Sequence, residues 1–478
     1  MSVRMVKAGY LFTAKEAATW CGGELLGASS SEVSGAEVDS RRCKNGVLFF
    51  ALSGERVDGH NYIDAAVKAG AIGAVVSTEW SDTEDAVNVF RHTADDVFFI
   101  IVDNPLRALQ RIAAEYLKGI SGPVRVGITG SNGKTTTKEL IASVLSEKYS
   151  VVKTAGNYNS EIGLPLTVFN IKNEHDYAVI EMGVNRLGEM DVLSEILRPD
   201  VVVITNIGTA HIGIFGNKDT IAEEKRHSVS RFDGDGTLFV AEDEPYAGFL
   251  AEGLKGRSIV YGRESLEADG GLNYKNLGLR GWAIEIDGEV IEYPLIGEHN
   301  LKNAFCACAV GRFAELGIKE LKAGLESVNP LFGRGEIIEG AVTIIQDSYN
   351  ANVDSMFTSM AFADNLDWSG SKYYVFGDMK ELGSDSEKMH RQLGREAASC
   401  RADKVFFFGE DSVSAFEEAK QRAKESPVFF HTNEYKALED ELLLNLKPDD
   451  LLLLKGSRSM NLERLIEPVN MKFGREKC

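Results

Sequence analysis

Residues 127–137 read GITGSNGKTTT, and this stretch decides the fold of the segment around it. The apolar run VRVGIT at 124–129 leads into it, and KELIASVLSEK at 138–148 follows with apolar residues on one face. This order predicts a strand, a glycine turn and a helix. Glycines let bare backbone N–H groups approach an anion, and the start of a helix adds the positive end of its dipole. The stretch therefore predicts a phosphate cradle in an α/β fold.

The residues expected to form this cradle are consecutive: Gly130, Ser131, Asn132, Gly133, Lys134, Thr135 and Thr136. Lys134 is long enough to reach the terminal phosphates of ATP, and the Thr135 hydroxyl suits Mg²⁺. The spacing departs from the common phosphate loop at Ile128, where that loop has glycine. A glycine turn without a ligand is the alternative, but Lys-Thr between a strand and a helix favours a nucleotide site.

Length, charge and cysteine usage limit the class of protein. The 478 residues suffice for about two to four domains, and the net charge of -20 argues against a broad surface for nucleic acid or anionic membranes. Cys306 and Cys308 fit neither a zinc site nor a disulfide framework, so we expect free thiols. Lys7 and Lys15 interrupt the N-terminal apolar residues, and no apolar run is long enough for a bilayer. We therefore expect a cytoplasmic protein with no signal peptide, membrane span or nucleic-acid partner.

Apolar strand-like runs alternate with helical stretches along the chain, which indicates parallel sheets covered on both faces. Gly and Pro punctuate 119–125 and 329–333, and we place domain boundaries there. We expect a smaller α/β domain at 1–120, a central parallel-sheet phosphate-loop ATPase domain at 121–330, and a Rossmann-like domain at 331–478. The expected strands are 47–52, 71–77, 97–103, 124–129, 177–183, 201–205, 237–241, 343–348, 373–379, 404–409 and 451–457, with a helix at 301–316.

Polar residues follow many of these strands, in the place where parallel sheets bind ligands. They are Glu181, Asn206, His211, Asp347, Asn350, Asp378 and Lys455, besides the cradle itself. Because they fall in two adjacent segments, we expect one cleft between the central and C-terminal domains.

Several longer blocks resemble one family, the Mur ligases of peptidoglycan synthesis. In the central segment these are GNYNSEIGLPLT (156–167), EMG (181–183), TNIGTAHIGIFG (205–216) and GEHNLKNA (297–304). Elsewhere they are VDSRRCKNGVLFFALSGERVDGHNYI (38–63), DSYNANVDSM (347–356), GDMKELG (377–383) and KGSRSMNLE (455–463). The last four blocks, together with GNYNSEIGLPLT, are similar to the group that adds D-alanyl-D-alanine. The Asp-Asn-Pro-Arg signature of the diamino-acid-adding group is missing.

The resemblance implies an ATP-dependent, ADP-forming amide ligase. ATP would phosphorylate the carboxylate of a UDP-N-acetylmuramoyl-tripeptide, and the amine of D-alanyl-D-alanine would displace phosphate from the acyl phosphate. It also implies two Mg²⁺ ions and a monomer, and it leaves lysine, diaminopimelate or another diamino acid open as the third peptide residue. The alternatives are a folylpolyglutamate synthase of similar fold, a simple kinase or NTPase, and a catalytically silent binding protein.

The candidates for catalysis are Lys134, Glu181, His211 and Lys225, and the candidates for holding the cations are Thr135, Glu181, His211 and Lys225. Besides Thr135, Glu181 is a carboxylate at a strand end, with a salt bridge as its alternative role. The resemblance makes His211 a ligand of a second Mg²⁺, although a lone histidine is more often only a hydrogen-bonding residue. It also implies that Lys225 can take up CO₂ as a carbamate, against the alternative of a surface lysine. Arg226 stands where the family has glycine, and Gly213 stands where an acidic residue is frequent.

The remaining candidates are binding residues implied by the resemblance. Asn303 would contact adenine, unless Asn300 only caps a helix there; Arg334 would contact phosphate and Asp347 ribose. The amides of Asn350 and Asn352 would bind nucleotide or dipeptide, with turn chemistry as the alternative. Lys455 and Arg458 would bind the dipeptide carboxylate or a phosphate, with an exposed basic loop as the alternative. Val353 replaces the family's proline in that block. The UDP-sugar would be contacted by Asp39, Ser40 and Arg41, with an ordinary turn as their alternative role. The muramoyl peptide would be contacted by Asn157, Asn159 and Glu161. Lys153 and Lys172 are interpreted as solvated surface.

Overall fold

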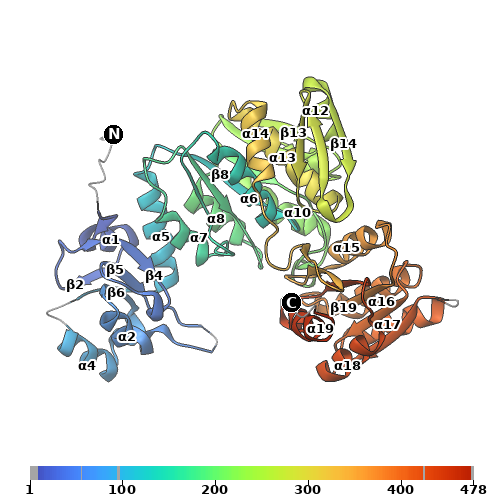
Figure 1. Cartoon of the computed structure of the whole chain (residues 1–478). Coiled ribbons are helices and arrows are strands. Elements are labelled where there is room, and N and C mark those ends of the chain that lie inside the picture. The colour runs from blue at the N-terminus through green and yellow to red at the C-terminus, as the bar shows by residue number, and fades with distance from the viewer. Residues whose placement is uncertain (1–8, 55, 94–96, 424–425, 475–478) are drawn as a thin grey trace.

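The computed structural model describes residues 9–54, 56–93, 97–423 and 426–474. Each of the three expected segments contains one main sheet, and Figure 1 shows them following one another through the molecule. We call them the N-terminal, central and C-terminal parts. The α/β fold class is confirmed. No helix in the described ranges combines the length and apolar character needed to cross a bilayer.

The N-terminal part contains a five-stranded sheet in the order β2-β7-β6-β5-β4. Its inner strands are parallel and only the edge strand β2 is antiparallel, so the ends of β4, β5, β6 and β7 face the same way. The elements are β1 (Phe12–Thr13), α1 (Ala14–Cys21), β2 (Glu24–Leu26), β3 (Glu32–Val33), β4 (Gly35–Glu37), β5 (Val47–Phe50), α2 (Ile63–Lys68), β6 (Ala71–Ser77), α3 (Thr78–Ser81), α4 (Glu84–Thr93), β7 (Phe98–Val102) and α5 (Pro105–Lys118).

The central part contains a six-stranded parallel sheet in the order β13-β12-β11-β8-β10-β9. The phosphate-cradle strand β8 is an inner strand, so its end is enclosed by neighbours on both sides. The elements are β8 (Val124–Thr129), α6 (Lys134–Ser146), β9 (Val151–Lys153), α7 (Gly163–Val168), β10 (Tyr177–Glu181), α8 (Glu189–Leu197), β11 (Val201–Ile204), α9 (Ile212–Phe215), α10 (Lys218–Arg226), β12 (Gly236–Ala241), α11 (Ala247–Ala251), β13 (Gly256–Tyr261), α12 (Arg263–Gly270), α13 (Glu298–Phe313) and α14 (Ile318–Glu326).

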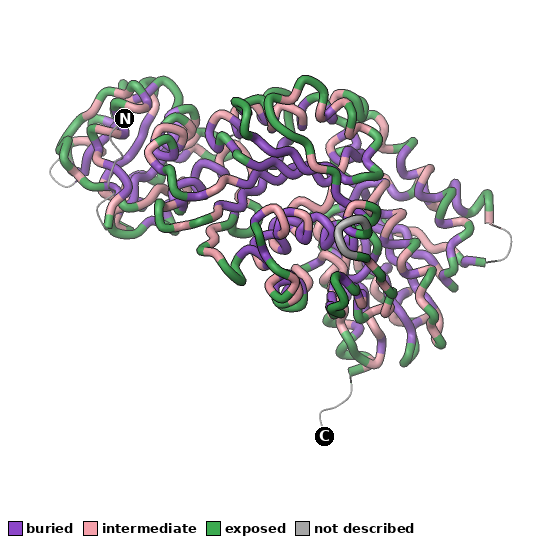
Figure 2. Tube along the Cα trace, turned by 90° about the horizontal axis from the view of Figure 1, so that it is seen from above, coloured by how far each residue is buried: buried purple, intermediate pink, exposed green. Residues whose placement is uncertain are grey.

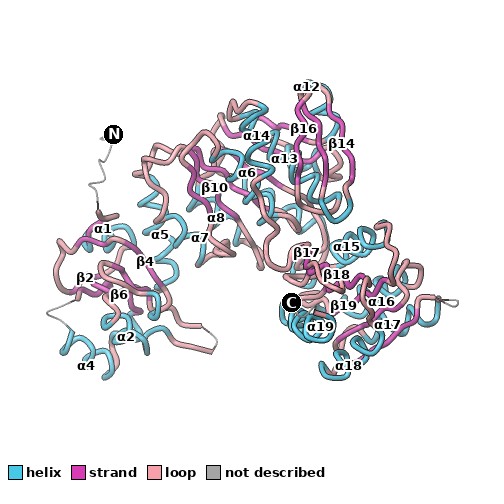
Figure 3. Tube along the Cα trace, viewed as in Figure 1, coloured by secondary structure: helices cyan, strands magenta, loops and turns pink. Residues whose placement is uncertain are grey.

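A small antiparallel sheet in the central part differs from the expected all-parallel arrangement. It consists of β14 (Leu272–Asn276), β15 (Trp282–Ile286) and β16 (Glu289–Tyr293). Figure 3 shows it beside α12 and α13, on the side away from the N-terminal part. Its strands alternate buried and exposed residues because only one face packs on the core, a pattern that a search for fully apolar runs does not detect.

The C-terminal part contains a six-stranded sheet in the order β17-β18-β22-β19-β20-β21, parallel except for the edge strand β17. Its inner strand β22 is buried on both faces, which explains the run of leucines. The elements are β17 (Glu336–Ile338), β18 (Thr343–Asp347), α15 (Val353–Asn365), β19 (Lys372–Gly377), α16 (Ser386–Ala397), β20 (Lys404–Phe408), α17 (Val413–Arg422), β21 (Val428–Thr432), α18 (Tyr435–Asn445), β22 (Leu451–Lys455) and α19 (Ile466–Phe473).

All the expected strands are present, whereas the helix expected at 301–316 is shifted. It is α13, which begins at Glu298 after Gly297 and ends at Phe313, because Glu315 adopts a left-handed backbone conformation with φ of 58°. Asn300 therefore lies inside the helix and is not its N-cap; its side-chain amide donates to the carbonyl of Ile296 at 2.8 Å.

Helix α5 joins the N-terminal and central parts. Its Tyr116 packs against Phe12 and Phe169, and the Tyr116 hydroxyl donates to the Ile171 carbonyl at 2.8 Å. Lys172 lies at this junction, not in solvent: its ammonium donates to the Phe169 carbonyl at 3.0 Å, and burial lowers its pKa. Lys153 is exposed, as expected. Figure 2 shows buried segments within each part. One cluster of buried apolar residues has members from all three parts, so the parts share apolar core.

Arg125 provides a test of this junction. Its guanidinium donates to the carbonyls of Leu117 at 3.1 Å and Ile120 at 2.6 Å, so it holds the connector against β8. Arg125→Met leaves these carbonyls without a charged donor, and we expect the free energy of unfolding in urea to fall by about 2 kcal/mol. The control Arg263→Met removes a surface pair with Glu267 and is expected to change it by less than about 0.5 kcal/mol. Equal losses in the two variants would contradict the role of Arg125.

Candidate active site

The glycine turn between β8 and α6 has the geometry of an anion cradle. Gly130 and Gly133 have φ of 145° and 80°, a region that favours glycine. No side chain caps the N-terminus of α6, so the N–H groups of its first turn remain available for an anion. A side chain at Gly133 would come within 3.0 Å of Asn303 Oδ1, which places Asn303 directly against the turn.

The loop after β11 braces this turn from the side. The backbone N–H of Ser131 donates to the Asn206 carbonyl at 2.9 Å, and that of Asn132 donates to Asn206 Oδ1 at 3.1 Å. The Gly208 N–H in turn donates to Ser131 Oγ at 2.8 Å. Ser131 and Asn132 therefore use their backbone donors to fix the turn, and the open N–H groups are those at the start of α6.

Lys134 points back over the turn that it follows. Its ammonium donates to the Gly130 carbonyl at 2.9 Å and lies 3.4 Å from the Ser131 carbonyl. Burial lowers the pKa of Lys134, and the nearby charge of Glu181 opposes that shift. Thr135 is buried at the start of α6, next to Lys134. A phosphate entering the cradle would give this ammonium an ionic partner in place of two carbonyls.

Glu181, at the end of β10, is buried, and only one of its two carboxylate oxygens accepts a hydrogen bond in the described part of the chain. Its Oε1 accepts from the Asn159 amide at 2.7 Å, while its Oε2 has no hydrogen-bond partner in the described part of the chain. No ion pair to Glu181 is formed among the described residues, so the salt-bridge alternative is not realised by direct contact. A buried carboxylate oxygen without a donor is costly unless a cation or donor arrives, so Glu181 fits the role of a Mg²⁺ ligand.

His211 faces a residue of the C-terminal part. It occupies a left-handed conformation at φ 59°, and its Nδ1 lies 2.9 Å from Glu381 Oε2. This contact lowers the pKa of Glu381. Gly213 lies against the backbone of Leu382 and Gly383, where a larger side chain has no room, which accounts for glycine at this position. With Nδ1 next to Glu381, the ring offers Nε2 to a cation.

Lys225 is buried on α10, so the surface-lysine alternative is wrong. Burial, and then the charge of Lys134, lowers its pKa well below the usual value. Within the described ranges its ammonium has no hydrogen bond or ion pair. The neighbouring Glu224 instead accepts from the N–H groups of Gly188 and Met190, both at 2.8 Å, at the start of α8. Arg226 points elsewhere, over the Phe249 ring at 4.8 Å, so its replacement of glycine leaves Lys225 in place.

These candidates do not form a metal site by themselves. In the ranges that the structure describes, no three His, Cys, Asp or Glu side chains are grouped closely enough to hold a metal ion. Cations here would therefore need oxygens from a bound phosphate or substrate in addition to Glu181 and Thr135.

The C-terminal part reaches the glycine turn through the start of α15. The Asn352 amide donates to Asn132 Oδ1 at 2.8 Å, while its own Oδ1 caps α15. Asn352 thus has the capping role that was the alternative to nucleotide or dipeptide binding, and its amide also reaches the glycine turn. Asp354 Oδ2 accepts from the Thr209 N–H at 2.7 Å and from the Thr209 hydroxyl at 2.8 Å. Sequence reasoning missed Asp354 and Glu381, although both lie in blocks that carried the resemblance.

Lys455 is a buried cation in the C-terminal part, not an exposed loop residue. Its ammonium lies 3.3 Å from Asp347 Oδ2 and donates to the Asn350 carbonyl at 2.6 Å. Burial lowers its pKa, and the Asp347 charge opposes that shift. Arg334 stacks on the Tyr349 ring at 4.0 Å, close enough for its charge to affect Lys455. Asp347, Asn350, Arg334 and Lys455 therefore form one cluster.

Two other expected residues of this part are used elsewhere. Arg458 pairs with Glu463 at 2.5 Å at the surface and stacks on Phe332. Asp378 accepts from the Ser412 N–H at 2.8 Å and pairs with Lys380, so it holds neighbouring loops together.

The expected UDP-sugar residues form a turn after β4. Asp39 accepts from the Arg41 guanidinium at 2.9 and 2.7 Å, which lowers the pKa of Asp39 to about 2, and Ser40 is buried beneath them. Arg41 is exposed, and Arg42 is the residue that reaches the central part, 5.3 Å above the Tyr158 ring. Asp39 therefore forms the ordinary turn that was its alternative role, and the Arg41 guanidinium is exposed to solvent.

The expected muramoyl-peptide residues lie on the loop between β9 and α7. Asn159 contacts Glu181, and its carbonyl accepts from the Gly183 N–H at 2.8 Å. Glu161 pairs with Arg186, and the Asn157 carbonyl accepts from the Asn159 N–H. This loop therefore borders the buried carboxylate.

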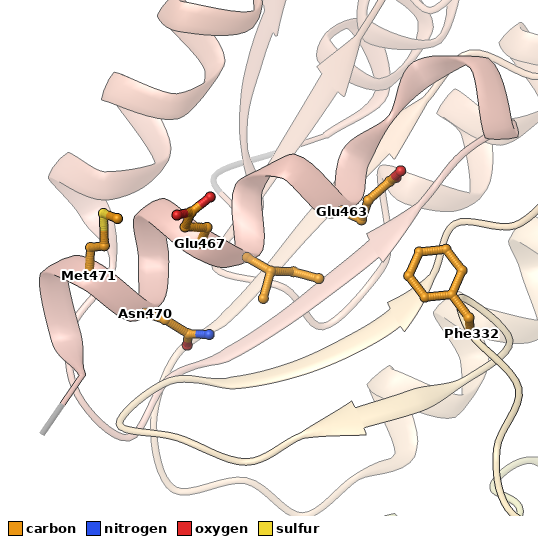
Figure 4. Close-up of a pocket in the computed structure, with 6 residues that line it drawn as sticks. Phe332, Glu463, Glu467, Asn470 and Met471 are labelled. Atoms are coloured by element: carbon orange, nitrogen blue, oxygen red, sulfur yellow. The ribbon is translucent and has the colours of Figure 1, made fainter. Parts of the chain in front are cut away.

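Two cavities of the structure lie apart from these residues. One of about 540 Å³ lies between Phe332 and the side chains of α19, including Glu467 and Met471 (Figure 4). Another of about 630 Å³ lies in the N-terminal part beside Asp103 and Arg107. None of the expected site residues lines either cavity.

Asp354 and Thr209 provide a test of the contact between the central and C-terminal parts. Asp354→Ala removes the acceptor that holds the loop after β11 against the glycine turn. We expect the affinity for ADP in titration calorimetry to fall about fivefold, which corresponds to about 1 kcal/mol of binding free energy. Thr209→Val should weaken binding less in the parent protein and not at all in the Asp354→Ala variant. Thr358→Val, which removes a hydroxyl bonded only within α15, is the control. Additive effects of the Asp354 and Thr209 substitutions would contradict the coupling.

Three family models match the chain: "Mur ligase family, catalytic domain" at 32–117, "Mur ligase middle domain" at 128–311, and "Mur ligase, glutamate ligase domain" at 333–458. Together they span most of the described chain.

Relatives and solved structures agree with these models. UDP-N-acetylmuramoyl-tripeptide--D-alanyl-D-alanine ligases of Treponema pallidum and Bacillus subtilis are 38% and 34% identical, and the alignments cover 92% and 91% of this chain and 94% and 93% of theirs. MurF of Acinetobacter baumannii superposes with a TM-score of 0.82 at 29% identity, over 95% of this chain and 98% of that one. MurF of Thermotoga maritima, solved with ADP, gives 0.76 at 27%, over 92% and 97%. The chain belongs to the Mur ligase family.

Proposed function

We propose that this chain joins D-alanyl-D-alanine to the terminal carboxylate of a UDP-N-acetylmuramoyl-tripeptide, with ATP converted to ADP and phosphate. The buried Glu181, with one free carboxylate oxygen beside the Lys134 cradle, is the observation that carries the proposal. It gives one place where a phosphate and a cation meet, next to the loop between β9 and α7 that carries Asn159. Similarity to ligases of this specificity over nearly the whole chain supports the same conclusion.

Each part has a proposed task. Residues 1–120 bind the UDP-sugar through Asp39, Ser40 and Arg41, residues 121–330 bind ATP, and residues 331–478 bind ATP and the dipeptide. The Arg41 guanidinium is exposed and can fork onto a diphosphate if it leaves Asp39. Asn157, Asn159 and Glu161 lie on a loop that Arg42 of the N-terminal part touches through Tyr158, which fits a substrate spanning both parts.

In the central part, the start of α6 and Lys134 hold the terminal phosphates. Mg²⁺ would be held by Thr135, Glu181 and His211, with Lys225 as a further ligand, and would supply charge neutralisation and orientation. Lys134 balances charge that develops on the transferred phosphate, and Asn159 fixes the direction of Glu181. Asn303, against Gly133, is placed to contact the nucleoside.

In the C-terminal part, Arg334 and Asp347 contact phosphate and ribose. Asn352 borders the glycine turn, whereas Asn350 lies beside Lys455. Arg458 is available for the dipeptide carboxylate if it exchanges Glu463 for it. The buried Lys455 orients Asp347 and the Asn350 carbonyl, so its task is to position them.

Lys225 has the properties needed for carbamate formation. Lowering the pKa of Lys225 raises the share of neutral amine, whose nitrogen lone pair can attack CO₂. The N–C bond forms, the nitrogen loses a proton to water, and the side chain becomes an anion. An anion here would offset the charge of Lys134 and offer oxygen to a cation.

Product assays test the proposed reaction. ADP release should require both UDP-muramoyl-tripeptide and D-alanyl-D-alanine, whereas a simple NTPase would ignore both and a folylpolyglutamate synthase would reject them. Lys134→Ala removes the charge that faces the transferred phosphate, and we expect kcat to fall by on the order of 10²–10³. Lys153→Ala changes an exposed lysine and should keep activity. Undiminished turnover in Lys134→Ala would refute the cradle assignment.

Lys225 can be tested without an activity assay. Protein equilibrated with ¹³C-bicarbonate should show one carbamate carbon resonance that disappears in Lys225→Ala and falls when the amine is protonated at low pH. Lys218→Ala, at the start of the same helix, should retain the resonance. A spectrum identical in the parent and Lys225→Ala proteins would exclude the modification.

A further inference from the structure

We propose that Lys138 is a positioning residue that fixes the substrate loop, residues 154–161, and Glu181 to the phosphate-cradle helix α6. The inference rests on the proposed function, because it assigns that loop to the muramoyl-peptide substrate. Lys138 is a lysine with no exposed surface, and neither its burial nor its contacts are used in the steps described above.

Lys138 lies one helical turn after Lys134, and the two side chains go to different places. Lys134 bends back to the glycine turn, whereas the Lys138 ammonium donates to the Thr154 carbonyl at 2.8 Å and lies 3.4 Å from the Gly156 carbonyl. These two carbonyls are at the root of the substrate loop, just after β9. One helix therefore holds the nucleotide cradle at its first residue and the substrate loop one turn later.

Thr154 passes this restraint on to Glu181. Its hydroxyl accepts from the Glu181 N–H at 2.9 Å, and its own N–H donates to the Val179 carbonyl at 3.1 Å. At the other side, the Asn159 amide of the same loop holds Glu181 Oε1 at 2.7 Å. The carboxylate is thus fixed at its backbone and at one oxygen by the loop that Lys138 anchors, and its Oε2 stays free.

The charge of Lys138 is not needed to balance its neighbour. Glu139 Oε1 lies 2.9 Å from the Lys138 ammonium, but the other oxygen of Glu139 pairs with the exposed Lys153. Burying an ammonium is unfavourable, and an apolar side chain of similar length often serves packing as well or better. What an apolar side chain cannot supply is directed donors to two loop carbonyls. The presence of a buried lysine at position 138 is therefore best explained by its hydrogen bonds to the Thr154 and Gly156 carbonyls.

The comparison of Lys138→Met with Lys153→Met tests this inference, because both lysines contact Glu139 and only Lys138 reaches the loop. In Lys138→Met we expect kcat/KM for UDP-muramoyl-tripeptide to fall at least about tenfold, with the affinity for ADP unchanged within about twofold. Amide hydrogen exchange of residues 155–163, measured without substrates, should become faster. Lys153→Met should match the parent protein in all three measurements.

Thr154→Val removes the next link while keeping Lys138, and it should reproduce the loss in kcat/KM with unchanged ADP affinity even if Lys138→Met fails to fold. Unchanged exchange and kcat/KM in the two variants, or an equal loss of ADP affinity and kcat/KM, would overturn the positioning role. A failure of the proposed function appears differently: the parent protein would release no ADP with the tripeptide, while the exchange measurement would still report on Lys138.

Discussion

The rest of the site depends on an unbalanced set of charges beside the glycine turn. The charge of Lys134 helps to lower the pKa of the buried Lys225 amine, and Glu181 is the carboxylate whose charge opposes the lowering of the Lys134 pKa. One oxygen of Glu181 is held by an amide and the other has no partner in the described chain. Such an arrangement is unfavourable in an empty protein and becomes favourable when phosphate and cations enter, because unpaired groups then gain partners.

The site is also shared between two parts of the chain, and close backbone approach makes this possible. Gly208 lies between the Asp354 carboxylate and Ser131, so a side chain there would separate the C-terminal part from the glycine turn. Gly213 meets Leu382 and Gly383 in the same way, next to the His211–Glu381 contact. The loop after β11 can therefore approach α15 at Gly208 and the loop after β19 at Gly213 because glycines stand at both places.

The sequence was sufficient for features set by local pattern and insufficient for features set by packing between distant segments. Fully apolar strands and the glycine turn were found because each is a continuous signal. The small sheet β14–β16 was missed because its strands are covered on one face only. The interpretation of Lys172 as solvated surface is wrong, and so is the exposed-loop alternative for Lys455, because a lysine gives no sign in the sequence of the carbonyls that will surround it. Asp354, Glu381 and Arg42 act across parts of the chain, which no spacing rule describes.

Departures from a family motif should be judged by where each side chain points. Successive residues of a helix are about 100° apart around its axis. The side chains of Glu224, Lys225 and Arg226 therefore lie in three different surroundings. Glu224 caps α8, Lys225 enters the core beside Lys134, and Arg226 covers Phe249. A change at Arg226 therefore alters an outer contact and leaves the buried amine in place. The same periodicity lets Lys134 and Lys138, one turn apart on α6, hold the turn and the substrate loop respectively, so one rigid helix relates both halves of the reaction.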